Sequence, residues 1–132
     1  MVIVDSDVWS EVFRSKSKEP SRYAYILNEL IEGEEVVMIG PIRQEVLSGI
    51  RSKAQFESIR HALRSFPDVS LHEEIHELAA SFYNLCRSKG IQGSHTDFLI
   101  CAVSVQFGIK ILSKDKDYIQ YSKYIPIDIL SR

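Results

Sequence analysis

Short apolar runs recur along the chain, and helical patterns fill the stretches between them. The first run, Val2–Val4, is β-branched and ends directly before Asp5, and later runs are centred on residues 36–39, 109–113 and 125–130. Runs of this length without polar interruption are typical of strands buried on both faces of a parallel sheet. The pattern therefore predicts four short strands, the last at a sheet edge, where Pro126 is tolerated.

Between these runs, apolar residues return at helical spacing. The spacing predicts helices over residues 8–13, 20–32, 41–48, 52–66, 73–89 and 96–107, one turn at 118–121, and a further brief strand near residues 69–71. Glycines stand where several of these helices should end. Since strands alternate with helices, we expect one α/β domain over residues 1–132, with a mostly parallel sheet covered by helices on both faces.

The composition adds only a little to this prediction of the fold. The chain has 132 residues, 26% of them charged, with a formal net charge of -2. That balance argues against a broad electropositive surface, though not against a local basic patch. Cys86 and Cys101 fall within apolar helical patterns, which predicts reduced, buried thiols and a cytoplasmic location. No run is long and apolar enough to cross a membrane, and the start lacks the basic region of a signal peptide.

Acids stand at the ends of several predicted elements. Asp5 ends the first strand, Asp97 opens the most apolar helix, and Asp115 follows the third strand, while Glu45 lies about one turn inside the helix after the second strand. The carboxyl ends of parallel strands meet at one edge, where α/β folds bind ligands. Each acid alone is compatible with a structural or solvated role, and Asp97 suits the dipole at a helix start. Together they need a cation, a shared proton or solvent, because like charges repel.

Four stretches around these acids resemble the motifs of PIN-domain nucleases, in particular toxins of the VapC type. They are Ile3–Trp9, Pro41–Gly49, Thr96–Ala102 and Ile111–Tyr118, in the family's order and spread over nearly the whole chain. The resemblance implies a three-layer α/β/α fold around a central parallel sheet. It also implies an acidic cluster that binds Mg²⁺ or Mn²⁺ and cleaves RNA.

Carried over residue by residue, the resemblance assigns the catalytic acids to Asp5, Glu45, Asp97 and Asp115. Hard oxygen ligands suit Mg²⁺. One bound ion activates and orients water, and a second, if present, stabilises the leaving oxygen. We assign Asp5 and Asp97 as the principal metal ligands, with Glu45 and Asp115 acting through water or orienting the attacking water.

Neighbouring residues complete this expectation. Ser6 and Ser113 match the family's hydroxyl residues beside the first and fourth acids. Asp7 departs from the pattern, because Ser or Asn is more common there, and it is a further candidate metal ligand. Asp117 duplicates Asp115 two residues later, and we favour Asp115 because it follows the strand more closely.

The resemblance also implies partners. It implies an antitoxin whose C-terminal segment covers the acidic crevice, a homodimer, and an RNA substrate cut in single-stranded or loop regions. Arg14, Lys16 and Arg43 are candidate RNA contacts, although each is also compatible with a solvated surface charge. Two alternatives stay open: a PIN nuclease of RNA processing without an antitoxin, and a binding module that keeps the fold without catalysis.

One motif points to different chemistry. Residues 72–76, His-Glu-Glu-Ile-His, match the H-E-x-x-H pattern of zinc metalloproteases. The match begins where a helix starts, and no third zinc ligand follows at a persuasive spacing. The protease hypothesis also leaves the four acids without a role. It is therefore the weaker alternative, and exposed histidines on a first helical turn are the simpler interpretation.

Overall fold

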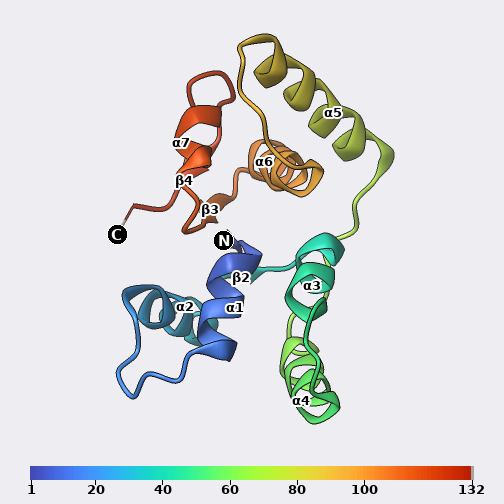
Figure 1. Ribbon diagram of the computed structural model, residues 1–132. Coiled ribbons are helices and arrows are strands. Elements are labelled where there is room, and N and C mark those ends of the chain that lie inside the picture. Colours follow the sequence, from blue (N-terminus) through green and yellow to red (C-terminus); the bar gives the residue numbers. More distant parts are fainter. Residues whose placement is uncertain (132) are drawn as a thin grey trace.

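A four-stranded parallel sheet lies at the centre of the computed structural model, which describes residues 1–131. The strands are β1 (Val2–Val4), β2 (Val36–Val37), β3 (Lys110–Leu112) and β4 (Asp128–Ile129), in the spatial order β2-β1-β3-β4 (Figure 1). Ile3 of β1 pairs with Val37 on one side and Ile111 on the other. The first strand is therefore central, and its apolar residues are buried on both faces.

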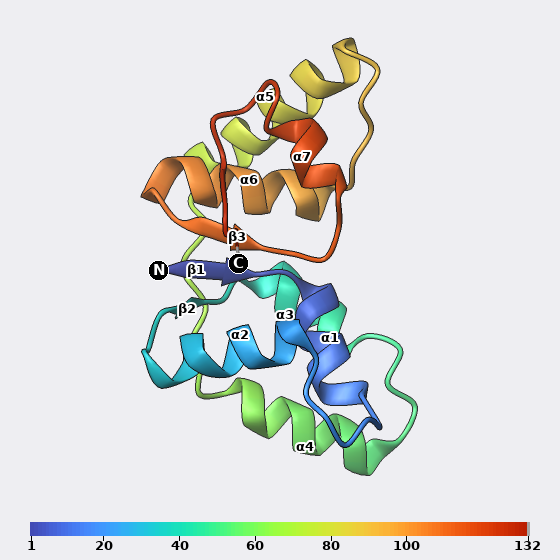
Figure 2. The same cartoon turned by 90° about the vertical axis from the view of Figure 1, so that its left-hand side faces the viewer.

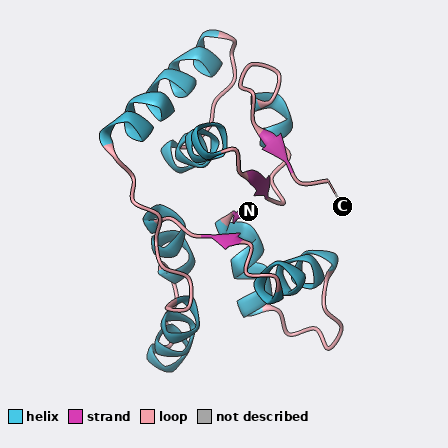
Figure 3. Ribbon diagram, turned by 180° about the vertical axis from the view of Figure 1, so that it is seen from behind, coloured by secondary structure: helices cyan, strands magenta, loops and turns pink. Residues whose placement is uncertain are grey.

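Helices cover both faces of this sheet. They are α1 (Ser6–Arg14), α2 (Arg22–Glu32), α3 (Gly40–Leu47), α4 (Lys53–Leu63), α5 (Glu73–Ser88), α6 (His95–Phe107) and α7 (Asp117–Tyr121). Figure 2 shows α5, α6 and α7 on one side of the strands and α1, α2 and α4 on the other. Figure 3 shows the short strands enclosed by these helices. The predicted α/β class with three layers is confirmed.

The most apolar helix is the most buried, as its composition predicts. Residues Phe98 and Ile100–Val103 of α6 are fully enclosed between α5 and the sheet. Ser104, the buried polar residue of this helix, donates from Oγ to the carbonyl of Ile109 at 2.6 Å. Gly108 then takes the left-handed conformation, with φ of 64°, and turns the chain directly into β3.

Some predicted boundaries are wrong. The second strand keeps only Val36–Val37, because Ile39 already caps α3 and Met38 forms only an isolated bridge with Asp68. That bridge replaces the predicted strand near residues 69–71. Residues 64–66, predicted as helical, lie beyond the end of α4. The last strand starts at Asp128, since the carbonyl of Ile125 is occupied by the N–H of Ile127 in a tight turn around Pro126.

Two further expectations concern the cysteines and the membrane. Cys86 and Cys101 are free and buried, as predicted, and burial raises the pKa of the Cys101 thiol well above its ordinary value. Across residues 1–131, no helix has both the length and the apolar character to traverse a bilayer.

Candidate active site

Asp5 and Ser113 meet where β1 and β3 end. Val4 pairs with Leu112, so the next residue of each strand emerges at the same edge of the sheet. Ser113 Oγ donates to Asp5 Oδ2 at 2.8 Å. Asp5 also caps α1, because its Oδ1 accepts from the backbone N–H of Ser6 at 2.8 Å. Strand pairing and a helix cap thus fix both oxygens of this buried carboxylate.

Glu45 reaches the same edge from α3. Ser6 Oγ lies 2.9 Å from Glu45 Oε1 and 3.5 Å from Asp5 Oδ1. The single proton of this hydroxyl therefore goes to Glu45, and the serine links the two acids. Glu45 itself is exposed, so it has access to water as well as to the buried aspartate.

Asp97 lies in the first turn of α6 and forms a capping box with Ser94. Ser94 Oγ accepts from the N–H of Asp97 at 3.0 Å, and the N–H of Ser94 donates back to Asp97 Oδ2 at 3.4 Å. Two hydroxyls from α7 also reach this carboxylate: that of Tyr121 lies 2.7 Å from Oδ2 and that of Tyr118 lies 3.4 Å from Oδ1. The structural role expected of a first-turn acid is present, together with contacts that such a role does not require.

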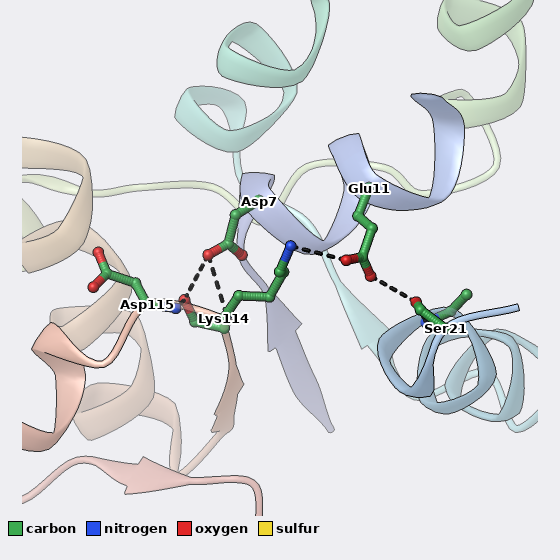
Figure 4. A network of polar contacts seen from close by, with 7 residues as sticks. Asp7, Glu11, Ser21, Lys114 and Asp115 are labelled. Atoms are coloured by element: carbon green, nitrogen blue, oxygen red, sulfur yellow. Dashed lines mark hydrogen bonds and ion pairs between the residues drawn. The ribbon is translucent and has the colours of Figure 1, made fainter. Parts of the chain in front are cut away.

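Asp7 is turned toward the loop after β3 rather than along its helix into solvent (Figure 4). Its Oδ2 accepts from the N–H of Lys114 at 3.1 Å and lies 3.3 Å from Ser113 Oγ. Its Oδ1 is buried and has no hydrogen-bond partner among residues 1–131. The lysine side chain extends the network, with Nζ 2.8 Å from Glu11 Oε1, and Glu11 Oε2 accepts from Ser21 Oγ at 2.6 Å. The network ties α1 to the β3–α7 loop and to the start of α2.

Asp115 lies on that loop and Asp117 is the first residue of α7, and both are exposed. The N–H of Asp115 donates to Ser113 Oγ at 3.0 Å, and Asp115 Oδ1 accepts from the N–H of Asp117 at 2.9 Å. Asp115 therefore follows β3 more closely and shapes the turn into α7. Repulsion from Asp115 raises the pKa of Asp117.

The acids at this edge act on one another electrostatically. Burial, followed by repulsion from Asp7 and a smaller contribution from Asp97, raises the pKa of Asp5 from 3.8 to about 6, against the hydrogen bonds from Ser113 and Ser6. Burial also raises the pKa of Asp7. Burial and the neighbouring acids raise the pKa of Tyr118 and Tyr121 well above the ordinary value, so both hydroxyls stay protonated donors. A site of this kind favours a bound cation.

Comparison with known proteins gives the family of this arrangement. The family profile described as "PIN domain" matches residues 2–124. The chain belongs to the PIN-domain family. The chain is also 26% identical over 121 residues to the VapC ribonuclease Mb1587 of Mycobacterium bovis and to ribonuclease VapC11 of Mycobacterium tuberculosis, with 89% of each chain covered.

Solved structures show the same fold at lower identity. FitAcB from Neisseria gonorrhoeae has a TM-score of 0.77 at 17% identity, covering 99% of this chain and 97% of that one. VapBC2 from Rickettsia felis bound to a DNA fragment from its promoter has a TM-score of 0.75 at 17% identity, covering 99% and 98%.

The donor set of this PIN domain fits a hard divalent cation. The acids and hydroxyls at the edge supply oxygen atoms alone, and one buried carboxylate oxygen, Asp7 Oδ1, has no partner in residues 1–131. No three acid, histidine or cysteine side chains of the described chain are close enough to bind one ion together. Mg²⁺ is usually held by one or two carboxylates and keeps several waters, so such an ion does not require a three-carboxylate cage.

The three candidate RNA contacts of the PIN domain differ in their surroundings. Arg14 and Lys16 are exposed at and just beyond the end of α1. Arg43 is held in place: Nε donates to Asp68 Oδ1 at 3.0 Å, Nη1 donates to the carbonyl of Leu63 at 3.0 Å, and Nη2 donates to the carbonyl of Phe66. Arg43 therefore connects α3 to the end of α4 and the segment after it, and these contacts favour a structural role over the predicted RNA contact.

The H-E-x-x-H stretch does not lie on one regular helix. His72 is the residue before α5, with extended backbone, and only His76 is helical. Both are exposed. No third zinc ligand joins them within residues 1–131. The geometry gives the metalloprotease hypothesis no support.

Tyr118 and Tyr121 are the site residues that the sequence did not single out. Their only signal was two tyrosines three positions apart in a predicted single turn. Buried tyrosines need a partner for the hydroxyl, and nothing in the sequence indicated that this partner would be Asp97.

Proposed function

We propose that this PIN domain is a Mg²⁺- or Mn²⁺-dependent endoribonuclease that serves as the toxin of a toxin–antitoxin pair. The observation that carries the proposal is that Asp7 and Asp97 lie near the buried Asp5 at the carboxyl edge of β1 and β3. Burial, followed by repulsion from Asp7 and a smaller contribution from Asp97, raises the pKa of Asp5 to about 6. The ribonuclease names of the sequence relatives support it. A toxin–antitoxin complex from Klebsiella pneumoniae, which has a TM-score of 0.67 at 17% identity and covers 89% of this chain and 90% of that one, has the same fold.

In this proposal each acid has a distinct task. Asp5 and Asp97 bind the cation, and Ser6 and Ser113 keep the two oxygens of Asp5 oriented through their hydrogen bonds. When bound, the cation stabilises negative charge on the phosphate and lowers the pKa of water. Glu45 is exposed and orients the attacking water or accepts its proton. Asp115 acts through water from the loop after β3.

Asp7 adds a carboxylate beside this pair. Its unpartnered Oδ1 is available as a further ligand oxygen, while Oδ2 stays on the loop backbone. Arg14 and Lys16 would hold the phosphate backbone of a single-stranded RNA near the end of α1.

An apolar cleft supports the antitoxin part of the proposal. A cavity of about 890 Å³ opens along α1, α2 and α4, and its lining includes Trp9, Val12, Phe13, Leu27 and Phe66. The Nε1 of Trp9 is buried there without a hydrogen-bond partner in the described residues. An apolar antitoxin segment would fill this cleft and continue along α1 toward the acidic edge. A homodimer through exposed side chains such as Tyr25 also belongs to the proposal.

The deciding experiment measures cleavage of a single-stranded RNA with Mn²⁺ or Mg²⁺, using wild type, Asp97→Asn and the matched control Asp128→Asn. Asp128 is exposed and pairs with Lys110 at the opposite end of the sheet. We expect Asp97→Asn to lower the rate on the order of 10²-fold or more, the scale of losing one charge-stabilising group. The control should cleave like wild type. Equal cleavage by the two variants, or cleavage that persists in EDTA, would refute the mechanism.

A growth assay tests the toxin role separately. Expression of the wild-type chain alone should arrest growth, and Asp97→Asn should relieve the arrest. A nuclease that cleaves RNA in vitro without arresting growth would contradict the toxin assignment and leave the chemistry intact.

A further inference from the structure

The hydroxyls of two buried tyrosines of α7 contact the carboxylate of Asp97. The Tyr121 hydroxyl donates to Oδ2 at 2.7 Å, a short and therefore strong hydrogen bond to a charged group. The Tyr118 hydroxyl lies 3.4 Å from Oδ1, close to the limit of a hydrogen bond. Both rings are buried, with exposed fractions of 0% for Tyr121 and 1% for Tyr118. The two contacts are thus unequal, and the stronger one falls on Oδ2.

Core packing fixes the place of the Tyr121 hydroxyl independently of Asp97. The Tyr121 ring packs on Phe98 at 4.9 Å between centroids and edge-on against Tyr118 at 5.3 Å. Gly93 leaves the space for it, because a Cβ at that position would lie 2.2 Å from the hydroxyl oxygen. The position of the Tyr121 hydroxyl is therefore fixed by packing, and the Asp97 carboxylate orients toward it.

The two carboxylate oxygens of Asp97 differ in the hydrogen bonds that they accept. Oδ2 receives both the Tyr121 hydroxyl and the backbone N–H of Ser94, so its lone pairs are occupied. Among residues 1–131, Oδ1 has only the 3.4 Å contact with Tyr118. Asp5 and Asp97 also lie near enough for mutual repulsion. The less engaged oxygen is therefore the one available to a cation shared with Asp5.

We propose that Tyr121 is a positioning residue that anchors Asp97 through Oδ2, so that the aspartate offers Oδ1 as its single metal-binding oxygen. This inference rests on the proposed function, since it requires Asp97 to bind a divalent cation. Partners that orient a metal ligand are known to change metal affinity by about 10–100-fold when they are removed. Without its anchor, Asp97 would rotate between orientations and bind the cation less well.

The test is the Mn²⁺ affinity of the full chain without RNA, measured by calorimetry for wild type, Tyr121→Phe and Tyr124→Phe. Phenylalanine keeps the ring on Phe98 and removes only the hydroxyl. Tyr124 is a partly exposed phenol three residues further along and serves as the matched control. We expect the Kd of Tyr121→Phe for Mn²⁺ to rise about 10-fold or more, and the control to match wild type.

A second readout separates positioning from a loss of structure. Tyr121→Phe should cleave RNA more slowly at low Mn²⁺ and recover most of the wild-type rate at saturating Mn²⁺, because the ligand itself is still present. A structural defect would lower the rate at every Mn²⁺ concentration, and that result would overturn the inference.

The outcomes also separate this inference from the proposed function. Wild-type Mn²⁺ affinity in Tyr121→Phe, with affinity lost in Asp97→Asn, would overturn the positioning role alone. No Mn²⁺ binding by wild type, together with undiminished RNA cleavage by Asp97→Asn, would overturn the proposed function and the positioning role with it.

Discussion

Replacing Asp5 by asparagine should stabilise the metal-free protein at neutral pH. The carboxylate is buried, and repulsion from Asp7 adds to the cost of ionising it. Asparagine has nearly the same shape, still accepts from the N–H of Ser6 as a helix cap, and offers its amide to Ser113. The variant therefore removes the charge while keeping the local hydrogen bonds.

The size of the effect follows from the pKa of Asp5, which lies at about 6 against an ordinary value of 3.8. Since each pKa unit corresponds to about 1.4 kcal/mol, ionised Asp5 costs the folded state about 3 kcal/mol. A buried amide is itself imperfectly satisfied, so we expect a net gain of about 1–2 kcal/mol. That gain corresponds to a rise in Tm of about 3–8 °C for a domain of this size.

The gain should depend on pH with a definite sign. The pKa of Asp5 is raised by folding, so the cost is absent well below 3.8, where the group is protonated in both states, and is complete above about 6. The ionisation cost should therefore be full at pH 7.5 and fall to about one third of that, about 1 kcal/mol, at pH 4.5. The penalty of the buried amide does not change with pH, so the net advantage of Asp5→Asn should disappear at pH 4.5.

The assay is urea unfolding in EDTA at these two pH values, with Asp128→Asn as an exposed control. The same unfolding is then measured with Mn²⁺ in place of EDTA. Mn²⁺ should stabilise wild type, because a ligand that binds only the folded state raises its stability, and it should leave Asp5→Asn nearly unchanged. The reasoning is refuted if Asp5→Asn is no more stable than wild type at pH 7.5, or if its gain is the same at both pH values.

Three further substitutions test other parts of the structure. Asp7→Ser removes a repulsion that raises the pKa of Asp5, so the acid limb of the pH–rate profile should move to lower pH; an unchanged limb would contradict this. Arg43→Lys loses the forked contacts to Asp68 and the α4 segment and should cost about 1–3 kcal/mol in urea unfolding, without weakening RNA binding. Gly93→Ala places a Cβ 2.2 Å from the Tyr121 hydroxyl and should cost about 1–3 kcal/mol while weakening Mn²⁺ binding; a stable variant with normal Mn²⁺ affinity would show that the tyrosine can move freely.

Local sequence patterns were enough to predict most of the strands and helices. The apolar run Val2–Val4 predicted a central strand, and the apolar composition of α6 predicted its burial, because burial follows directly from hydrophobicity. Boundaries were less accurate where tertiary contacts compete with local preference. Residues 64–66 continue a helical pattern, yet α4 has ended before them, and their segment is fastened to α3 by Arg43.

The candidate site, too, could be predicted from the sequence only in part. The position of the acids after strands predicted that Asp5 and Asp115 would lie at one sheet edge, since parallel strands bring their carboxyl ends together. The orientation of Asp7 could not be predicted, because it depends on the backbone of the loop after β3, more than a hundred residues away. The contacts of Arg43 could not be predicted either. Its charge made it a candidate RNA contact, but its side chain donates hydrogen bonds within the protein.

By itself, then, the sequence determined most of the strands and helices, though not all of their ends, and which acids follow them, because both depend mainly on neighbours along the chain. Only the tertiary structure decided how those acids are held. The carboxylate of Asp97 lies against two tyrosine hydroxyls of α7, and Asp5 accepts from the hydroxyl of Ser113, which follows β3. These contacts join residues far apart in sequence, and their geometry is set by core packing, which no local pattern encodes.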